Sequence, residues 1–225
     1  MDVMELMRAR HSVRAYESRP VEEEKVALLE AELAACNAQG GLRMRAVFGE
    51  KGAFSSAMAK YGKFSGVENY IAVVAEKGAK GAAVRAGYYG ERAVLAAQAL
   101  GLNTCWAVMT FSKRKAKKYA ALQRGEKLLC VIAFGYGKTQ GVPHRSKPLA
   151  KVINAPEDAP AWFVRGAEAA LLAPTAMNGQ KFLFTLLPDG IVRLENGGFC
   201  AALDRGILKC HFELGAGKEN FRWEE

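Results

Sequence analysis

The chain has 225 residues, of which 50% are hydrophobic and 24% are charged, and its formal net charge is +9. This is the composition of an ordinary globular protein, and the length accommodates one large domain or two small ones at roughly 150 residues each. A run of about 18 apolar residues is absent, which excludes a membrane-spanning helix. The opening residues lack the apolar core of a signal peptide, so we expect a cytoplasmic protein.

Hydrophobic periodicity, capping residues and turn residues predict helices that alternate with strands. The expected helices span residues 2–10, 20–38, 54–60, 82–100, 112–122, 161–172 and 203–214. The expected strands span residues 42–48, 70–75, 103–108, 128–134, 181–187 and 191–195, with a last strand near 221–223. Such alternation is typical of the α/β and α+β classes.

The cysteines and histidines do not form a pattern that carries chemistry. Five cysteines are widely spaced without a C-x-x-C pair, and the chain has only three histidines. We therefore expect reduced thiols and no metal site. Cys210 and His211 lie on an apolar helix, where packing in the core is expected rather than catalysis.

Positive charge is concentrated in the first part of the chain. Residues 1–150 carry a net charge of +11, whereas residues 151–225 carry −2. This excess favours an anionic partner, such as nucleic acid, an acidic membrane or a phosphate-bearing small molecule. Two basic clusters, at residues 10–14 and 145–147, offer arginine and lysine donors suited to phosphate oxygens. A solvated basic surface is the alternative interpretation of each cluster.

Residues 173–180 form an unusual turn after a helix, because they are apolar apart from Thr175, Asn178 and Gln180. Each of the two amides presents a donor and an acceptor side by side, which suits the edge of a planar heterocycle. The alternative is a turn in which the amides satisfy backbone groups.

The chain contains a weak internal repeat. Residues 33–43 and 171–181 are identical at four aligned positions, and in both copies a helix precedes and an apolar strand follows. A second match pairs residues 97–106 with 211–223. The first copy alone has the basic clusters and the second alone has the amide-bearing turn. We interpret the chain as two halves, residues 1–155 and 156–225, that share one composite site.

Several of these segments resemble the flavin-dependent nitroreductases. Residues 10–16 are similar to their R-x-S-[VI]-R-x-[FY] opening, and residues 98–106 are similar to their long helix running into G-L-G-x-x-W. Residues 134–149 resemble the G-Y-P…[KR]-x-R-x-P-L tail, and residues 173–180 resemble the A-P-S-x-x-N-x-Q-P turn. Residues 204–213 resemble a tandem-repeat branch, in which one chain imitates the usual homodimer.

The resemblance implies a nitroreductase-like α+β fold, with two tandem half-domains that form a pseudo-dimer of helix-wrapped sheets. It also implies one FMN between the halves, NAD(P)H as the electron donor, and a nitroaromatic, quinone or similar small molecule as the acceptor. A monomer is expected because the halves mimic a dimer, and no side chain is expected to act as a catalytic group. The implied cofactor-binding residues are Arg10, His11, Ser12, Arg14, Lys63, Arg145, Lys147, Pro174, Thr175, Ala176, Asn178 and Gln180.

Parts of the sequence are compatible with three other functions. The basic helix at residues 112–118 is compatible with nucleic-acid binding, although it lacks a base-reading motif and resembles a solvated helix face. Residues 135–141 suggest the glycine loop of a nicotinamide dehydrogenase, but their spacing is G-x-G-x-x-x-G and no helix follows. The third alternative is a degenerate, cofactor-free family member that serves as a binding protein.

Overall fold

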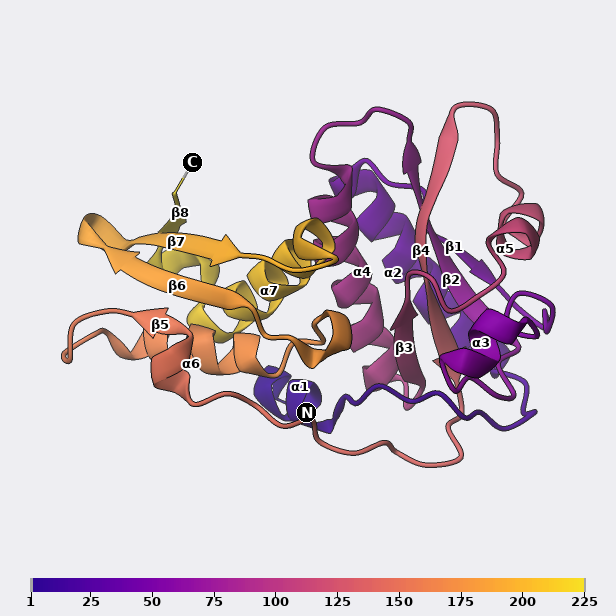
Figure 1. Ribbon diagram of the computed structural model, residues 1–225, viewed down its shortest axis with the longest axis horizontal. Helices are drawn as coiled ribbons and strands as arrows, with labels where there is room; N and C mark the ends of the chain where they lie inside the picture. Colours follow the sequence, from indigo (N-terminus) through magenta and orange to yellow (C-terminus); the bar gives the residue numbers. More distant parts are fainter. Residues whose placement is uncertain (1, 225) are drawn as a thin grey trace.

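The computed structural model describes residues 2–224, which form two four-stranded sheets on either side of a central helix pair (Figure 1). The first sheet has the order β1-β2-β4-β3, and each strand in it is antiparallel to its neighbours. Its strands are β1 (Arg45–Val47), β2 (Asn69–Glu76), β3 (Asn103–Ala107) and β4 (Glu126–Gly135).

Both faces of the first sheet are covered, which explains the continuous apolar run in β2. Side chains alternate between the faces of a strand, so Tyr70, Ala72 and Val74 enter one core and Ile71, Val73 and Ala75 enter the other. The helices α3 (Ala57–Tyr61) and α5 (Lys113–Tyr119) cover the first of these faces. The longer helices α2 (Glu23–Gly40) and α4 (Ala82–Ala99) cover the second.

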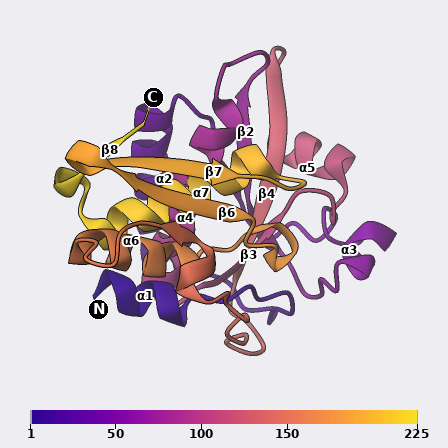
Figure 2. The ribbon, with the colours of Figure 1, turned by 60° about the vertical axis from the view of Figure 1, so that its left-hand side comes forward.

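The second sheet has the order β5-β6-β7-β8 and is mixed. Its strands are β5 (Ile153–Asn154), β6 (Phe182–Leu187), β7 (Ile191–Asn196) and β8 (Arg222–Trp223), and only the β6–β7 hairpin is antiparallel. The helices α6 (Ala161–Leu171) and α7 (Ala201–Ala216) pack on this sheet through an aromatic core that includes Phe163, Phe184 and Phe212. Figure 2 brings the β6–β7 hairpin forward and shows α6 below it.

The halves meet where α4 crosses α7, and the short helix α1 (Val3–Ala9) packs on both. A Cβ atom on Gly87 would overlap the carbonyl oxygen of Leu203, and one on Gly206 would overlap that of Val84. Small residues at a helix crossing let the two backbones approach closely, and here glycine is required on both sides. The stripe of small residues along α4 is thereby explained.

The predicted α+β class is confirmed, and so are the predicted helices and strands, with shifts at their ends. The sequence missed β5, because a strand of two residues carries no periodic signal. β5 also joins the second sheet at Ile153, before the expected boundary at residue 156. Cys210 and His211 are buried in the core, as expected. Among residues 2–224, no helix has the length and apolarity needed to cross a bilayer.

Candidate functional site

A cleft between the two halves contains most of the residues that the sequence singled out. It consists of two cavities, which we call the basic cavity, of about 290 Å³, and the apolar cavity, of about 230 Å³. Residues from both halves line both cavities, which share Ser12, Arg14, Pro174, Thr175 and Met177. The basic cavity adds Arg10, His11, His144 and Asn178, and the apolar cavity adds Trp106 and Ala176.

The first basic cluster follows α1 and runs along the edge of the first sheet. Ser12 forms a parallel bridge with Thr104 of β3, and the backbone nitrogen of Val13 donates to the Thr104 carbonyl oxygen at 3.0 Å. The alternation of an extended chain then buries Val13 in the core and leaves Ser12 and Arg14 exposed at the cleft. The R-x-S-x-R spacing therefore places the polar side chains of Ser12 and Arg14 in the cleft.

Arg10 lies deeper and connects the cleft to a buried polar network. Its side chain is 3% exposed, its Nη2 donates to the Leu172 carbonyl oxygen at 3.4 Å, and its Nε lies 3.8 Å from Glu91 Oε1. Glu91 is fully buried, lies 2.9 Å from His211 Nε2 and accepts a hydrogen bond from Trp106 Nε1 at 2.8 Å. This network fixes the Trp106 ring in the wall of the apolar cavity.

The wall from the second half is the turn at residues 174–178. Met177 and Asn178 both have positive φ angles, of 54° and 52°, in the left-handed region that non-glycine residues rarely adopt. The carboxylate of Asp204, in the first turn of α7, accepts from the backbone nitrogen of Ala176 at 3.2 Å and holds the turn in place. Burial raises the pKa of Asp204 to about 6.

The amide of Gln180 binds backbone groups rather than the cleft. It is 2% exposed, its Oε1 accepts from the Lys147 backbone nitrogen at 2.8 Å, and its Nε2 donates to the Arg145 carbonyl oxygen at 2.7 Å. Of the two interpretations of this turn, backbone satisfaction is the one that the structure supports for Gln180. Asn178 also donates to the Arg145 carbonyl oxygen, at 3.0 Å, yet lines the basic cavity.

The second basic cluster reaches the cleft through a different residue than expected. Neither Arg145 nor Lys147 lines the basic or the apolar cavity, and Lys147 Nζ donates to the Gln180 carbonyl oxygen at 2.7 Å. His144 lines the basic cavity instead, and its Nε2 lies 2.9 Å from the Leu171 carbonyl oxygen. The basic composition of this segment indicated that it could reach the cleft, but only the fold decides which of its side chains lines the cavity.

His11 lies close to the imidazole of His144 and to Arg10. Partial burial lowers the pKa of His11, and the positive charge of Arg10 and the proximity of His144 lower it further. At neutral pH the His11 ring therefore favours its uncharged form. Permanent positive charge in the basic cavity comes from Arg10 and Arg14.

Lys63 lies beside the cleft rather than in it. It lines a third cavity of about 360 Å³, which we call the side cavity, together with Arg14, Trp106 and Thr110. These three residues also line the apolar cavity, so the two spaces adjoin. Lys63 would therefore contact the same ligand as Ser12 only if that ligand extends from the apolar cavity into the side cavity.

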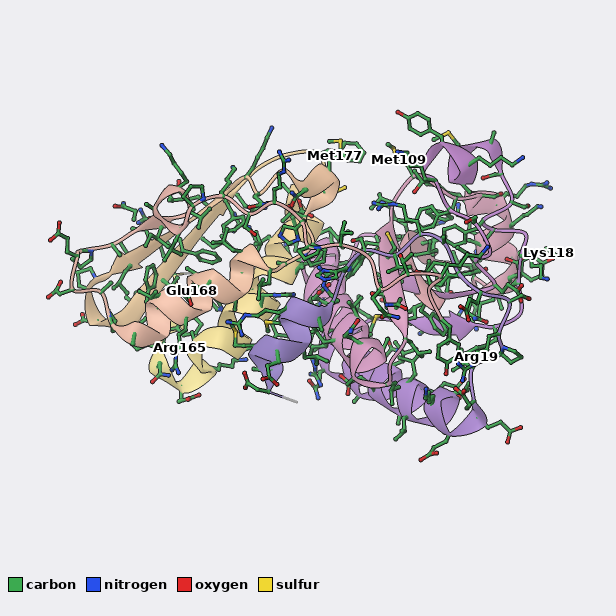
Figure 3. The ribbon with its side chains drawn as sticks, turned by 90° about the horizontal axis from the view of Figure 1, so that it is seen from below. Arg19, Met109, Lys118, Arg165, Glu168 and Met177 are labelled. Carbon is green, nitrogen blue, oxygen red and sulfur yellow. The ribbon has the colours of Figure 1, made fainter. Side chains whose placement is uncertain are left out.

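Exposed apolar side chains surround the mouth of the apolar cavity. Met109, Met177 and Phe199 are 51%, 88% and 62% exposed and line this cavity. Figure 3 shows Met109 and Met177, from different halves, near each other on the same side of the molecule. Large exposed apolar groups at a cavity mouth are typical of a binding site. Residue-level sequence patterns could not predict this rim, since its members are far apart in the chain.

Residues 2–216 match the family model described as "Putative TM nitroreductase". The chain belongs to this family. The match covers both halves of the protein, so the resemblance inferred from the separate motifs is confirmed for the chain as a whole. No curated protein matches the sequence.

Solved structures confirm that the chain has the nitroreductase fold. A Thermotoga maritima protein described as a "putative nitroreductase" is 23% identical, with a TM-score of 0.68 over 97% of this chain and 85% of its own. A Bacteroides thetaiotaomicron protein described as a "putative NADH dehydrogenase/NAD(P)H nitroreductase" is 23% identical, with a TM-score of 0.53 over 67% and 95%.

Proposed function

We propose that this nitroreductase-family protein binds one FMN in the cleft and transfers electrons from NAD(P)H to a nitroaromatic, a quinone or a similar acceptor. The observation that carries the proposal is the meeting of Ser12 and Asn178 in one cavity, although they come from opposite halves. In the homodimers that the family motifs imply, the corresponding residues would come from two subunits. The single chain supplies both, which also leads us to expect a monomer.

The chemistry of the cleft fits FMN at both ends. Arg10 lines the basic cavity, and its buried Nε has no hydrogen-bond partner among the described residues. That nitrogen is closed to solvent and faces Glu91, so the attraction for a phosphate group in this cavity would come from the permanent positive charge of the guanidinium. The apolar cavity, bounded by Trp106, Pro174 and Ala176, suits a flat ring system. Together the two cavities, of about 290 Å³ and 230 Å³, exceed the volume of roughly 300 Å³ at which typical ligand and cofactor sites begin.

Bound FMN would supply the hydride chemistry, and the residues of the chain would position it. Arg10 and Arg14 would bind its anionic end, and Ser12 would donate at the junction between the two cavities. Glu91 and His211 hold Trp106 in one orientation and thereby maintain the shape of the ring site. Asp204 holds the turn from the second half against the cleft. The carboxyl group of Asp204 can hold a proton below about pH 6.

A titration of the flavin-free protein with FMN tests this proposal, with quenching of flavin fluorescence as the signal. We expect saturation at one FMN per chain, and Ser12→Ala should weaken binding by roughly tenfold to a hundredfold, the effect of losing one hydrogen bond to a charged group. Ser55→Ala is the matched control, because Ser55 is exposed and lines neither cavity of the cleft. Failure to bind FMN, or equal effects of the two variants, would contradict the proposal.

One observation favours a second candidate, a cofactor-free binding protein with the same fold. Gln180 and Lys147, both expected to hold the cofactor, instead bind each other's backbone groups. This second function predicts a stably folded protein that binds no flavin at any concentration tested. The same titration therefore distinguishes the two candidates.

A further inference from the structure

The side cavity combines positive charge with aromatic surface, and none of the carboxylates within residues 2–224 lines it. Its cations are Arg14 and Lys63, both exposed to solvent, and its aromatic residues are Tyr61, Phe64 and Trp106. The Arg14 guanidinium lies over the Phe64 ring, 6.0 Å from the ring centroid. Such a wall suits a ligand that is both flat and anionic, because the rings provide apolar contact and the cations attract its charge.

Local backbone features hold this wall in place. α3 ends at Tyr61, and Gly62 brings the chain against the segment that follows β3, since a Cβ atom there would lie only 2.6 Å from Cβ of Thr110. Lys63 follows with a φ angle of +60°, and its backbone nitrogen donates to the Lys60 carbonyl oxygen at 2.8 Å. This tight turn places Lys63 in the cavity wall, whereas Lys60 is absent from it.

The position of the side cavity points to a role in the proposed reaction. Arg14, Trp106 and Thr110 line both this cavity and the apolar cavity, where we place the flavin ring. A molecule in the side cavity would therefore lie beside the ring. The cofactor itself does not require this space, because the basic and apolar cavities together accommodate a phosphate end and a ring end.

We propose that the side cavity is the acceptor subsite and that it selects planar aromatic acceptors bearing a carboxylate, through Lys63 and Arg14. This inference rests on the proposed function. Lys63 would bind the carboxylate, and the fixed Trp106 ring would bind the aromatic face. Arg14 also lines the cleft, so Lys63 is the residue whose effect reports on the acceptor alone.

Steady-state kinetics with a matched pair of acceptors test this subsite in the FMN-loaded protein. The pair is 4-nitrobenzoate and its neutral methyl ester, and the measured quantity is the ratio of their kcat/KM values. We expect Lys63→Gln to lower the ratio of kcat/KM for the anion to kcat/KM for the ester by about threefold to tenfold, which is the effect of one partly exposed charge pair. Lys63→Glu should lower this ratio further. Lys60→Gln, on the same surface but outside the cavity, should leave the ratio unchanged.

Equilibrium binding of benzoate and benzamide, which are not reduced, provides a readout that does not depend on turnover. Lys63→Gln should weaken benzoate binding and leave benzamide binding unchanged. Equal effects of the Lys63 and Lys60 variants on the acceptor ratio would overturn the subsite. So would an effect of Lys63→Gln on discrimination between NADPH and NADH without any effect on the acceptors. A protein that reduces neither acceptor and binds no FMN would instead refute the proposed function itself.

Discussion

Gly87 of α4 and Gly206 of α7 occupy reciprocal positions where the two halves of the chain meet. Each lies against the carbonyl oxygen of a residue three positions before the other glycine, Leu203 in one case and Val84 in the other. The separation along the chain from Gly87 to Gly206 equals that from Val84 to Leu203, as expected for two copies related by a pseudo-twofold axis. This separation differs from the one between Ala97 and His211 in the sequence match.

The helix crossing predicts a large effect of adding one methyl group. Gly206→Ala would force α7 away from the Val84 carbonyl oxygen, and overpacking of this kind costs about 3 kcal/mol in the free energy of unfolding. Gly197→Ala is the control, because a Cβ atom at Gly197 meets no atom within 4 Å. Urea denaturation of both variants checks the prediction, and similar midpoints would contradict it.

The buried network predicts that the negative charge of Glu91 stabilises the contact between the two halves. Both ring nitrogens of His211 face oxygen acceptors, at 2.9 Å from Glu91 and 3.0 Å from the Ala169 carbonyl oxygen. Glu91→Gln removes the charge that balances Arg10 and presents an amide nitrogen to groups that donate. Breaking a buried ion pair lowers the free energy of unfolding by about 3–5 kcal/mol. Denaturation of Glu91→Gln measures this loss. Glu30→Gln, on an exposed position of α2, should cost little, and an equal loss in the two variants would refute the role of the network.

The raised pKa of Asp204 predicts a pH dependence with a definite sign. Its pKa is about 6 in the folded protein and near 3.8 in the unfolded chain, so the folded state binds the proton more tightly. The ionised group therefore costs stability above pH 6, and this cost disappears as the pH falls through the window from 6 to 4. Asp204→Asn keeps an oxygen that accepts from the Ala176 backbone nitrogen and removes the charge.

We expect Asp204→Asn to be more stable relative to the original protein at pH 8 than at pH 4, by about 2 kcal/mol. Denaturation at a series of pH values provides the measurement, and Asp158→Asn, at an exposed position, is the control. A stability difference that does not change with pH would show that burial does not perturb this carboxyl group.

Gln180 predicts a link between the amide-bearing turn and the basic segment. Its side chain binds the backbone of both Arg145 and Lys147, so Gln180→Leu removes the acceptor of the Lys147 backbone nitrogen and leaves the Arg145 carbonyl oxygen with the Asn178 amide as its donor. We expect a loss of about 1–3 kcal/mol and faster amide hydrogen exchange at Lys147. Gln123→Leu, at an exposed position, should change neither quantity. Unchanged exchange at Lys147 would mean that other contacts hold the segment.

Much of the fold was predictable because it depends on local signals. The continuous apolar run of β2 and the glycines at the end of α2 mark their elements directly in the sequence. Ser12 and Arg14 were also predictable, since their spacing fixes which side of an extended segment they occupy. The sequence could not predict the roles of three other residues, Arg145, Lys147 and Gln180. Each has a polar side chain suited to a ligand, and the sequence does not show whether a ligand or the backbone receives its hydrogen bonds.

The sequence by itself determined the two halves, the class of their elements and the two segments that meet in the cleft. Only the tertiary structure decided that His144 rather than Arg145 lines the basic cavity, that Lys63 belongs to a neighbouring space, and that Glu91 joins both halves. The physical reason is the range of the interactions involved. Periodicity, capping and turn preferences act over a few residues, whereas side-chain direction and burial depend on segments that pack together only after the chain has folded.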